Sequence, residues 1–448
     1  MPSSPSDVVA PTQPGKIEQW RWGVVWLMFL ATLINYSDRL ALNNTQRYFL
    51  PEFEPDPDLR NEVYANINFA FGLSFGLFQI AAGFLIDRFS LRYLYLGAIL
   101  IWSAAGVMTG FVPKEAVAAL IVCRVVLGVG EAFNWPCAVA CIRRVIPRES
   151  RGLANGIFHS GASIGAILTP LLVLALVDTS TGVGWRTVFI VVGAVGALWA
   201  VLWMLFTAGA RAVVIDSEPS PDPLPARTDQ PTADENVAVS TSSVTFWDVL
   251  GMRLFWICLG TGVCVNMCWH FYNQWFSRYL TEDLRVSGRS EQLILAGFYV
   301  AADLGSITSG WVIRGLIRGG YTVESSRKLV MTGLAVSVFL ATIPAAYLPA
   351  DLMPVKLGCF YLVAAAAVGG FAIFFSLAQD IVARRTAQIL GVCGCMSWLV
   401  ISGVTKTIGD LHLAGPGKYA SLFIGVGCVP LIAAVIGWFW PEPGGKKE

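Results

Sequence analysis

Four ionisable side chains lie within stretches that are apolar enough to form membrane-spanning helices: Asp38, Arg39, Arg124 and Glu131. A charge at the bilayer centre costs about 2.5 to 3.5 kcal/mol on the insertion scale, so one that persists normally faces the protein interior and has a partner or a role. A buried acid can carry a proton, and the planar fork of arginine can hold a carboxylate through two parallel bonds. These residue types therefore predict a proton-linked site for an organic anion.

The spacing of the four charges predicts how they pair. Arg124 and Glu131 are seven residues apart on one predicted helix, hence on one face and about 10 Å apart. Counted from the periplasmic helix ends, Asp38, Arg39 and Arg124 lie roughly 10 to 12 Å deep and Glu131 about 22 Å. We expect Arg124 to pair with Asp38, and Arg39 to be free to hold an anion. Glu131 then lies without an equal partner, and its desolvation favours proton uptake. The alternative is a structural ion-pair network that gates the outer face.

Polar and aromatic side chains on two further predicted helices suit a small polar ligand. One helix carries His159, and on the other Asn266, His270 and Asn273 share a face. Hydrogen bonding between helices would explain the second group nearly as well, and a lone histidine is often structural. The predicted substrate contacts are Tyr36, Arg39, Arg124, His159, Asn266, Tyr272 and Asn273, and the predicted proton carriers are Asp38 and Glu131.

The composition predicts that these residues are held by an integral membrane protein. The chain has 448 residues, of which 55% are hydrophobic and 14% charged, and its mean hydropathy is +0.62. The net charge of +1 does not suggest a nucleic-acid partner. About 20 mainly apolar residues are needed to cross a bilayer. Such runs predict twelve spans, at 21–46, 63–86, 91–111, 116–141, 152–177, 185–208, 254–280, 293–313, 328–348, 355–379, 387–406 and 419–440.

The predicted fold is all-α, with twelve transmembrane helices in two pseudo-symmetric six-helix halves, as in alternating-access transporters. The predicted divisions are an N-terminal tail at 1–20, a first half at 21–208, a proline-rich acidic linker at 209–245, a second half at 246–440 and a C-terminal tail at 441–448. Nineteen of the 31 Lys and Arg residues fall on the side of both termini, which predicts cytoplasmic termini for a multi-pass protein of the cell membrane, here a bacterial inner membrane. We expect a monomer.

The sequence gives no sign of an enzyme. It has three histidines, and it lacks the zinc, nucleophile-elbow and phosphate-loop motifs, so no catalytic set and no metal site are predicted. The predicted function is secondary active transport, namely proton symport of a small organic anion such as a sugar acid, with the proton as coupling ion and no other cofactor. A proton-coupled exporter, an anion exchanger of the same fold and a transport-dead membrane sensor stay open as alternatives.

Several motifs resemble those of a known family. The stretch from Gly83 through Asp87 and Arg88 to Arg92 is similar to the loop signature of the major facilitator superfamily, with Ser90 where glycine is usual. Further motifs resemble the anion:cation symporter family, nearest its hexuronate and sugar-acid branch. These motifs are Asn35-Tyr-Ser-Asp-Arg39, Gly128-Val-Gly-Glu-Ala-Phe-Asn-Trp-Pro136, Pro147-Arg-Glu-Ser-Arg-Gly-Leu-Ala-Asn-Gly156, Gly184-Trp-Arg-Thr-Val-Phe189 and Trp275-Phe-Ser-Arg-Tyr279.

The resemblance implies a proton-driven importer of organic anions. It implies that Asp38 and Glu131 carry the proton, that Arg39 and Arg124 serve the anion or the coupling network, and that the motif residues Gly83, Asp87, Arg88 and Arg92 act in gating. Two departures concern the substrate. Phe75 stands where tyrosine is common, and residues 368–375 are apolar where hexuronate-type members are polar, which argues against a strongly hydroxylated cargo.

Overall fold

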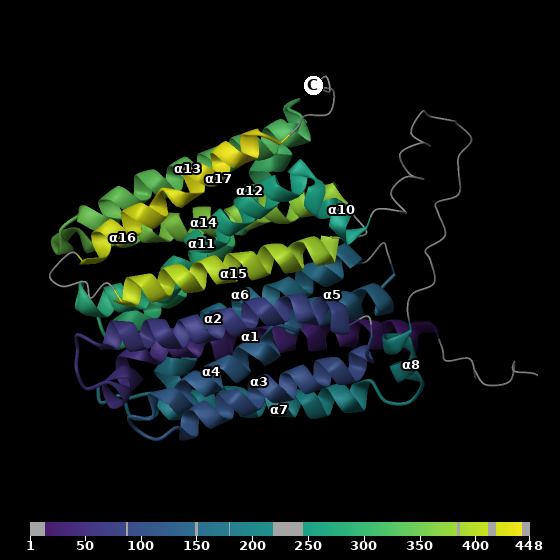
Figure 1. The fold of residues 1–448 in the computed structure, drawn as a ribbon, viewed down its shortest axis with the longest axis horizontal. Helices are drawn as coiled ribbons and strands as arrows, with labels where there is room; N and C mark the ends of the chain where they lie inside the picture. Colours follow the sequence, from purple (N-terminus) through teal and green to yellow (C-terminus); the bar gives the residue numbers. More distant parts are fainter. Residues whose placement is uncertain are drawn as a thin grey trace, which may run out of the picture.

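The computed structural model describes residues 14–86, 88–147, 151–178, 180–217, 245–382, 386–410 and 418–440. Long helices that run roughly side by side make up this part of the chain (Figure 1). The first half holds α1 (Pro14–Phe53), α2 (Arg60–Leu85), α3 (Leu91–Phe111), α4 (Val117–Glu131), α5 (Asn134–Val145), α6 (Arg151–Leu176) and α7 (Trp185–Phe206), followed by the short α8 (Ala210–Asp216).

The second half begins with the short α10 (Phe246–Gly251). It continues with α11 (Arg253–Glu282), α12 (Arg289–Arg318), α13 (Val323–Tyr347), the 3-10 turn η3 (Ala350–Leu352), α14 (Met353–Ile381), α15 (Thr386–Asp410), α16 (Lys418–Gly427) and α17 (Val429–Trp438). The halves meet where α15 packs on α2, α12 on α6 and α11 on α1. Figure 1 shows the first half in purple and blue below the green and yellow second half.

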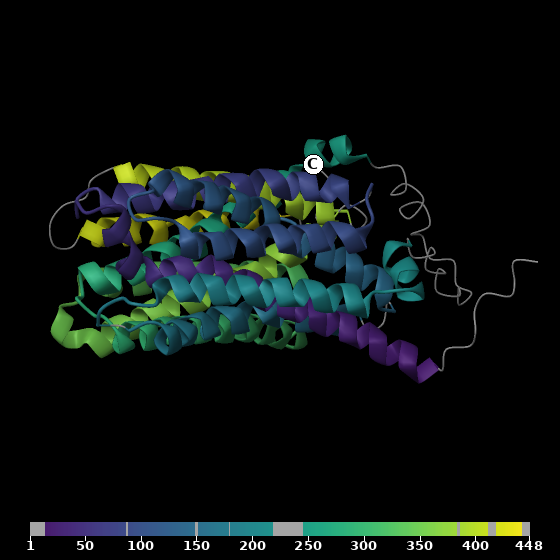
Figure 2. The ribbon, with the colours of Figure 1, turned by 90° about the horizontal axis from the view of Figure 1, so that it is seen from below.

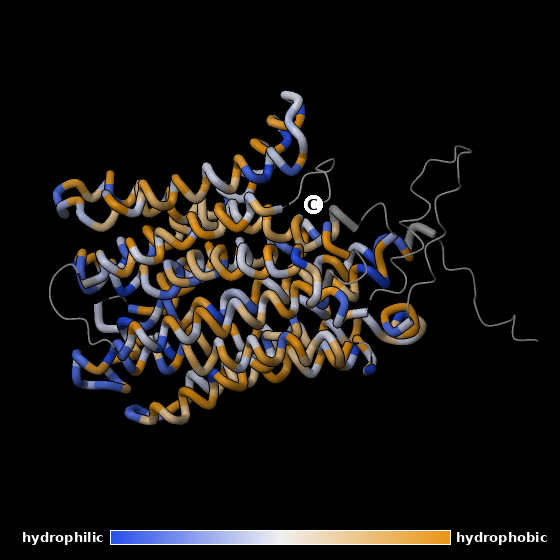
Figure 3. Tube along the Cα trace, turned by 45° about the horizontal axis from the view of Figure 1, so that its top comes forward, coloured by the Kyte–Doolittle hydropathy of each residue, from blue (hydrophilic) through white to orange (hydrophobic). Residues whose placement is uncertain are grey.

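Eleven helical segments of the described chain are long and apolar enough to cross a membrane. The helix α1 is the twelfth long element, and its 40 residues exceed the length that a span needs. Its mean hydropathy is lowered by the polar residues between Asn35 and Gln46, most of which are buried. The all-helical architecture of twelve helices in two halves is therefore confirmed. Apolar residues run along the helical bodies and polar residues gather toward their ends (Figure 3).

Two predicted spans are each built from two helices. The span predicted at 116–141 is broken between α4 and α5, and the span predicted at 419–440 is broken at Cys428 between α16 and α17. Each second segment has a proline in its first turn, Pro136 and Pro430 respectively. Proline lacks the amide hydrogen that would continue the preceding helix, yet its fixed φ suits a first turn. Each predicted span is still one membrane-crossing segment, Val117–Val145 and Tyr419–Trp438, so the two spans are confirmed and the break in each is a local feature of the helix.

The bundle has two ends, which we name by the chain segments that lie there. The linker end carries α8, α10 and the end of α17, and the far end carries the connections at 54–59 and 283–288. The helices extend lengthwise between these ends, and α1 projects beyond the bundle at the linker end (Figure 2). The predicted tails lie mostly outside the described residues, as does most of the predicted linker. The predicted cytoplasmic side corresponds to the linker end.

Candidate functional site

The length of α1 sets the depth of the charged site. This helix continues to Phe53, seven residues beyond the predicted end of the span at 46, because Phe49, Leu50 and Phe53 are buried against the first half. Arg39 is therefore fourteen residues from the far end of α1, and Glu131 is fourteen residues from Val117 at the start of α4. At 1.5 Å per residue both lie about 21 Å deep. The predicted depth of 10 to 12 Å for Arg39 was wrong for this reason.

Arg39 and Glu131 form a buried ion pair. The Arg39 Nε and Nη2 atoms donate to the same Glu131 oxygen, Oε2, at 2.9 and 2.8 Å. The Arg39 side chain is 11% exposed and that of Glu131 is fully buried. Glu131 Oε1 has no hydrogen-bond partner among the described residues. The expectations that Glu131 lacks a partner and that Arg39 is free to hold an anion are both wrong in this conformation.

Aromatic rings surround the Arg39 guanidinium. Its Cζ atom lies 4.5 Å from the ring centroid of Phe75, 5.2 Å from Tyr36, 5.4 Å from Phe71 and 5.5 Å from Trp398. Cations are attracted to aromatic faces at such distances, and the attraction is strongest where water is excluded. The rings therefore keep a cation favourable in the bundle interior, even at moments when Glu131 does not neutralise it. Tyr36, a predicted substrate contact, lies beside Arg39 but is not among the described residues that line the cavity below, and Phe75 contributes a ring face.

Asp38 and Arg124 lie near this pair but do not bind each other. Their side chains are almost fully buried, at 1% and 2% exposure. Within the described chain, both Asp38 carboxylate oxygens and the Arg124 Nε and Nη2 atoms lack hydrogen-bond partners. Arg124 instead lies over the ring of Phe189, with its Cζ atom 5.2 Å from the centroid. The predicted Asp38–Arg124 bond is therefore not formed, because Asp38 lies about 12 Å, or just over two helical turns, deeper than Arg124 when both are counted from the far helix ends.

A cavity between the halves brings both arginines together. Its empty space is about 360 Å³, which includes the part that is open to solvent. The first half contributes Arg39, Leu42, Asn43, Asn68, Phe71 and Arg124, and the second half contributes His270, Asn273, Gln274 and Trp398. Two guanidinium groups, several amides and one imidazole thus face one space. This set of donors suits an anion that also carries hydroxyl groups.

Of the residues predicted on α11 as candidates for substrate contact, some line the cavity and others do not. Asn273 lines the cavity, as does His270, whose ring lies 4.5 Å from that of Trp398. Asn266 donates to the Gly262 carbonyl of its own helix at 2.8 Å. Tyr272 is buried in the core of the second half, where its hydroxyl donates to the Phe423 carbonyl oxygen at 3.1 Å. The predicted substrate contact through Tyr272 is wrong, because on a helix a residue two positions from His270 faces the opposite side.

His159 lies outside this cavity lining, at another part of the seam between the halves. Its ring is 4.4 Å from that of Trp135 on α5 and 5.9 Å from that of Phe375 on α14. The side chain is exposed. Residues 368–375 of α14 are likewise absent from the described lining, so this apolar stretch does not form the second-half wall of the cavity. That wall comes from α11 and α15.

The described residues of the motif that was predicted to act in gating lie at the linker end. Arg92 donates from Nε to Thr207 Oγ1 at 2.9 Å and from Nη2 to the Met204 carbonyl at 3.2 Å, which ties α3 to α7. Ser90 caps α3 and donates to Asp216 of α8 at 2.7 Å, a bond that glycine could not make. A side chain at Gly83 would meet no atom within 4 Å, and Arg88 is exposed. Asp87 lies outside the described residues.

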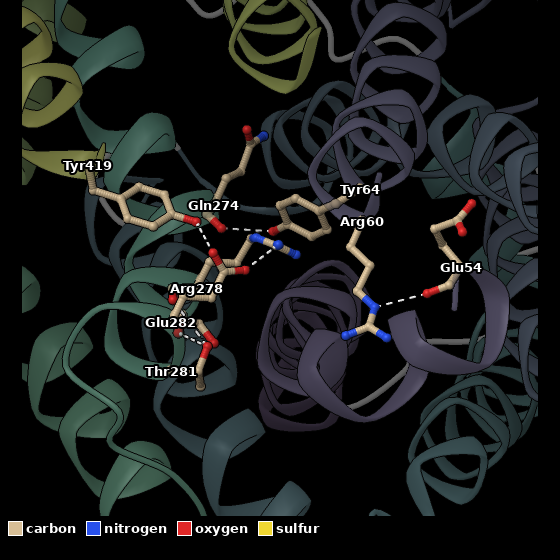
Figure 4. Close-up of polar contacts among 9 residues, drawn as sticks. Glu54, Arg60, Tyr64, Gln274, Arg278, Thr281, Glu282 and Tyr419 are labelled. Atoms are coloured by element: carbon tan, nitrogen blue, oxygen red, sulfur yellow. Dashed lines mark hydrogen bonds and ion pairs between the residues drawn. The ribbon is translucent and has the colours of Figure 1, made fainter. Parts of the chain in front are cut away.

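Hydrogen bonds between the halves lie on the far-end side of the arginine site. Asn43 of α1 donates to Asn273 Oδ1 at 3.1 Å. The Tyr64 hydroxyl of α2 lies 2.9 Å from Asn43 Oδ1 and 2.8 Å from the Gln274 carbonyl. Figure 4 shows the Tyr64–Gln274 contact beside Arg278, whose guanidinium lies 5.3 Å from the Tyr64 ring. This network therefore lies between the arginine site and the far end.

Several of these residues escaped prediction. Asn43 follows Arg39 by four positions, so its place on the same face of α1 was available as a signal. No sequence signal marks Asn68, Gln274 or Trp398, because their approach to the site depends on how α2, α11 and α15 pack. Apolar and amide side chains at helix interfaces are ordinary, and only the three-dimensional arrangement distinguishes these.

The fold and the cavity define a class of protein. Two six-helix halves around a central charged cavity are the architecture of a membrane transport protein that works by alternating access. A comparison with family models matches residues 28–405 to the Major Facilitator Superfamily. The chain belongs to this family. Its members are transporters and not enzymes, and the chain is a multi-pass membrane protein.

The chain is also similar to individual transporters. It is 27% identical to a D-galactonate transporter of Escherichia coli O6:H1, over 95% of this chain and 96% of that protein. It is 28% identical to a probable sulfoacetate transporter of Cupriavidus necator, over 90% and 92%, and 24% identical to the hexuronate transporter of Escherichia coli K12, over 94% of each. Among solved structures, a D-xylose–proton symporter has a TM-score of 0.71 at 15% identity, over 95% of this chain and 99% of that chain. An inward-facing bacterial homologue of the human lysosomal transporter Spinster has a TM-score of 0.68 at 17% identity, over 96% and 95%.

Proposed function

We propose that the chain is a proton-coupled symporter of small organic anions, with sugar-acid-like carboxylates as the substrate class. The observation that carries the proposal is the Arg39–Glu131 pair in a cavity that Arg124 also lines. Support for the substrate class comes from the transporters to which the chain is similar, whose names specify D-galactonate, hexuronate and sulfoacetate. The amides and the imidazole of the cavity suit the hydroxyl groups of a sugar acid.

Arg124 is the first anion contact in this proposal. Its Nε and Nη2 hydrogens have no hydrogen-bond partner among the described residues, although the side chain is 98% buried. A buried donor without a partner is costly, and a buried charge more so. A carboxylate entering the cavity would accept from these donors in a planar, charge-assisted arrangement. Binding would thus relieve a cost that the empty protein bears.

Glu131 couples a proton to the release of Arg39. While Glu131 is ionised, its Oε2 occupies two Arg39 donors. A proton taken up on that carboxylate cancels the charge that holds the guanidinium, so Arg39 becomes available to the substrate carboxylate. Asp38, whose carboxylate oxygens lack hydrogen-bond partners in the described structure, is a second buried acid that is able to carry a proton. Proton and anion then bind cooperatively, because each makes the site more favourable for the other.

The direction of transport follows from the gradients and from the affinities of the two states. Proton uptake at Glu131 from an acidic outer compartment would drive import under the usual bacterial gradient. The excess of basic residues supports a cytoplasmic linker end, which makes the far end the outer side. The Asn43, Tyr64 and Gln274 network links the halves between the arginine site and the far end, which supports an inward-facing state for this conformation.

The test is uptake into proteoliposomes that contain the purified protein. We expect an inward proton gradient to drive accumulation of D-galactonate, D-glucuronate or sulfoacetate, and an ionophore that collapses the gradient to stop it. Galactose, a neutral sugar, is the matched control and is expected to show no uptake. A thermal-shift screen against the same compounds at acid and neutral pH identifies the preferred anion. Uptake that is independent of pH, or binding of neutral sugars alone, would overturn the proposal.

A further inference from the structure

A third buried carboxylate, after Asp38 and Glu131, lies at the seam between the halves, away from the arginine site. Glu291, in the first turn of α12, is fully buried. Its Oε1 accepts from the Ser277 hydroxyl of α11 at 3.0 Å, whereas its Oε2 has no hydrogen-bond partner within the described chain. Desolvation makes an ionised carboxylate with one vacant oxygen unfavourable. Its position in the first turn, where the helix dipole favours negative charge, offsets part of that cost.

The charged group that faces Glu291 comes from the other half. Arg47 of α1 places its Nη1 atom 3.9 Å from Glu291 Oε2, too far for a hydrogen bond but close enough for strong attraction. The neighbouring residue Gln292 donates to the Asn44 carbonyl of α1 at 3.1 Å. Residues 44–47 of the first half and residues 291–292 of the second are thus joined by one hydrogen bond and one charge pair.

Other titratable and charged groups lie on the elements packed here. On α1, Tyr48 presents its ring 5.8 Å from Arg47 Cζ, and its hydroxyl, which has no hydrogen-bond partner among the described residues, interacts electrostatically with Glu291 and Arg47. On α11, Arg278 pairs with Glu282 of its own helix. On α14, the Tyr361 hydroxyl donates to the Ile294 carbonyl at 3.1 Å, and Lys356 donates to the Leu348 carbonyl at 2.7 Å. Arg47 is therefore the group whose interaction with Glu291 changes most when Glu291 gains or loses a proton.

We propose that Glu291 is a third proton-binding residue of the transport cycle and that its protonation opens the far end. In the ionised state its charge holds Arg47, and with it the first half, against α12. A proton from the far-side solvent binds Oε2, the oxygen without a hydrogen-bond partner, and leaves the Ser277 bond on Oε1 in place. The neutral acid no longer attracts Arg47, so the seam loses its charge pair. Acid on the far side would thereby expose the cavity to the compartment that supplies protons and substrate.

This inference rests on the proposed function, because a proton-sensitive far end has a role only if protons drive transport. Its test is nevertheless separate, since it measures the conformation and requires no substrate. Spin labels carried by an unnatural amino acid at Asp58 and Ser287, both exposed in far-end connections, report the separation of the halves. This labelling leaves the ten native cysteines in place. Pulsed electron–electron double resonance in nanodiscs then gives the distribution of distances between the two labels at pH 8 and pH 5.

We expect the wild type to be mainly closed at pH 8 and to gain a longer-distance population at pH 5. Glu291→Gln should raise that population at pH 8 by about 5-fold or more, which is the lower range of typical coupling between sites. Arg47→Gln removes the same charge pair from the other half and should have the same effect, so the test does not depend on one variant folding. Both variants should respond less to pH than the wild type.

The matched control is Glu52→Gln. Glu52 also lies at the far end, but it pairs with Arg186 at 2.6 Å within the first half. We expect its replacement to leave the distances between the halves unchanged. Wild-type distances at pH 8 in both Glu291→Gln and Arg47→Gln would overturn the inference, as would equal opening in Glu52→Gln. Absence of proton-driven carboxylate uptake by the wild-type protein would instead contradict the proposed function.

Discussion

Asp38 of α1 packs directly against Gly106 of α3. A Cβ atom built on Gly106 would lie 2.8 Å from Asp38 Oδ1 and 3.6 Å from the Gly193 Cα of α7. Glycine at this position therefore leaves the room that the carboxyl group occupies. The proton carrier proposed on α1 depends on the absence of a side chain on another helix.

Gly106→Ala should lower the stability of the purified protein by about 1 to 3 kcal/mol, the usual range for overpacking. It should also impair proton-driven uptake, because Asp38 must shift. The measurement is the unfolding midpoint together with uptake under a proton gradient. Gly97→Ala on the same helix is the control, since its Cβ would meet no atom within 4 Å. Equal stability of the two variants would show that the approach of Asp38 to Gly106 is unimportant.

Glu131→Gln should abolish proton-driven accumulation while preserving exchange of substrate across the membrane. The amide cannot ionise, so Arg39 stays available and the anion binds without a proton. Uptake driven by a pH gradient and counterflow without a gradient separate the two activities. Glu18→Gln, at an exposed position of α1, should retain both. A parallel loss of accumulation and counterflow in Glu131→Gln would argue for a structural ion pair instead.

Arg124→Lys should weaken anion binding by about 10-fold or more, although the positive charge is retained. Lysine lacks the planar fork, and a hydrogen bond to a charged group contributes about 1.5 to 3 kcal/mol. Titration calorimetry with the preferred carboxylate measures the change, and Arg39→Lys should show a similar loss at acid pH. Arg211→Lys, on an exposed position of α8, serves as the control. Unchanged affinity in Arg124→Lys would remove this residue from the binding site.

Tyr64→Phe should loosen the closed far end. The change deletes a hydroxyl that lies 2.9 Å from Asn43 Oδ1 and 2.8 Å from the Gln274 carbonyl, so two buried acceptors lose the single hydrogen that they share. We expect a loss of about 1 to 3 kcal/mol in stability and faster reaction of a cavity thiol introduced at Asn68 with a reagent added from the far side. Tyr321→Phe, at an exposed position, is the control. An unaltered reaction rate would show that the hydroxyl does not hold the gate.

Most of the fold follows from apolar patterning in the sequence. The predicted span at 91–111 coincides with α3, and most of the others differ from the observed helices by a few residues at each end. The exceptions have local causes. The far end of α1 contains a run of polar residues, so a search for hydrocarbon-spanning runs stops at residue 46, whereas burial of Phe49 and Phe53 carries the helix onward.

The charged residues of the site were predictable, but their partners were not. Rarity of charge in apolar runs is enough to single out Arg39, Arg124 and Glu131. Pairing depends on relative depth, and a helix end misplaced by seven residues shifts that depth by about 10 Å. The second-half wall was harder still, because a neutral amide such as Gln274 or a ring such as Trp398 resembles many others that only fill interfaces.

The continuity of α1 has a mechanical consequence. Asp38, Arg39, Asn43 and Arg47 are all on one unbroken helix of 40 residues, about 60 Å long. A tilt of about 10° around Arg39 would carry Phe53, about 21 Å away, sideways by roughly 4 Å. A small angular change at the arginine site thus produces a displacement at the far end that is larger than the width of a water molecule. The arginine site and the far end of α1 would then move together, because both are on one helix.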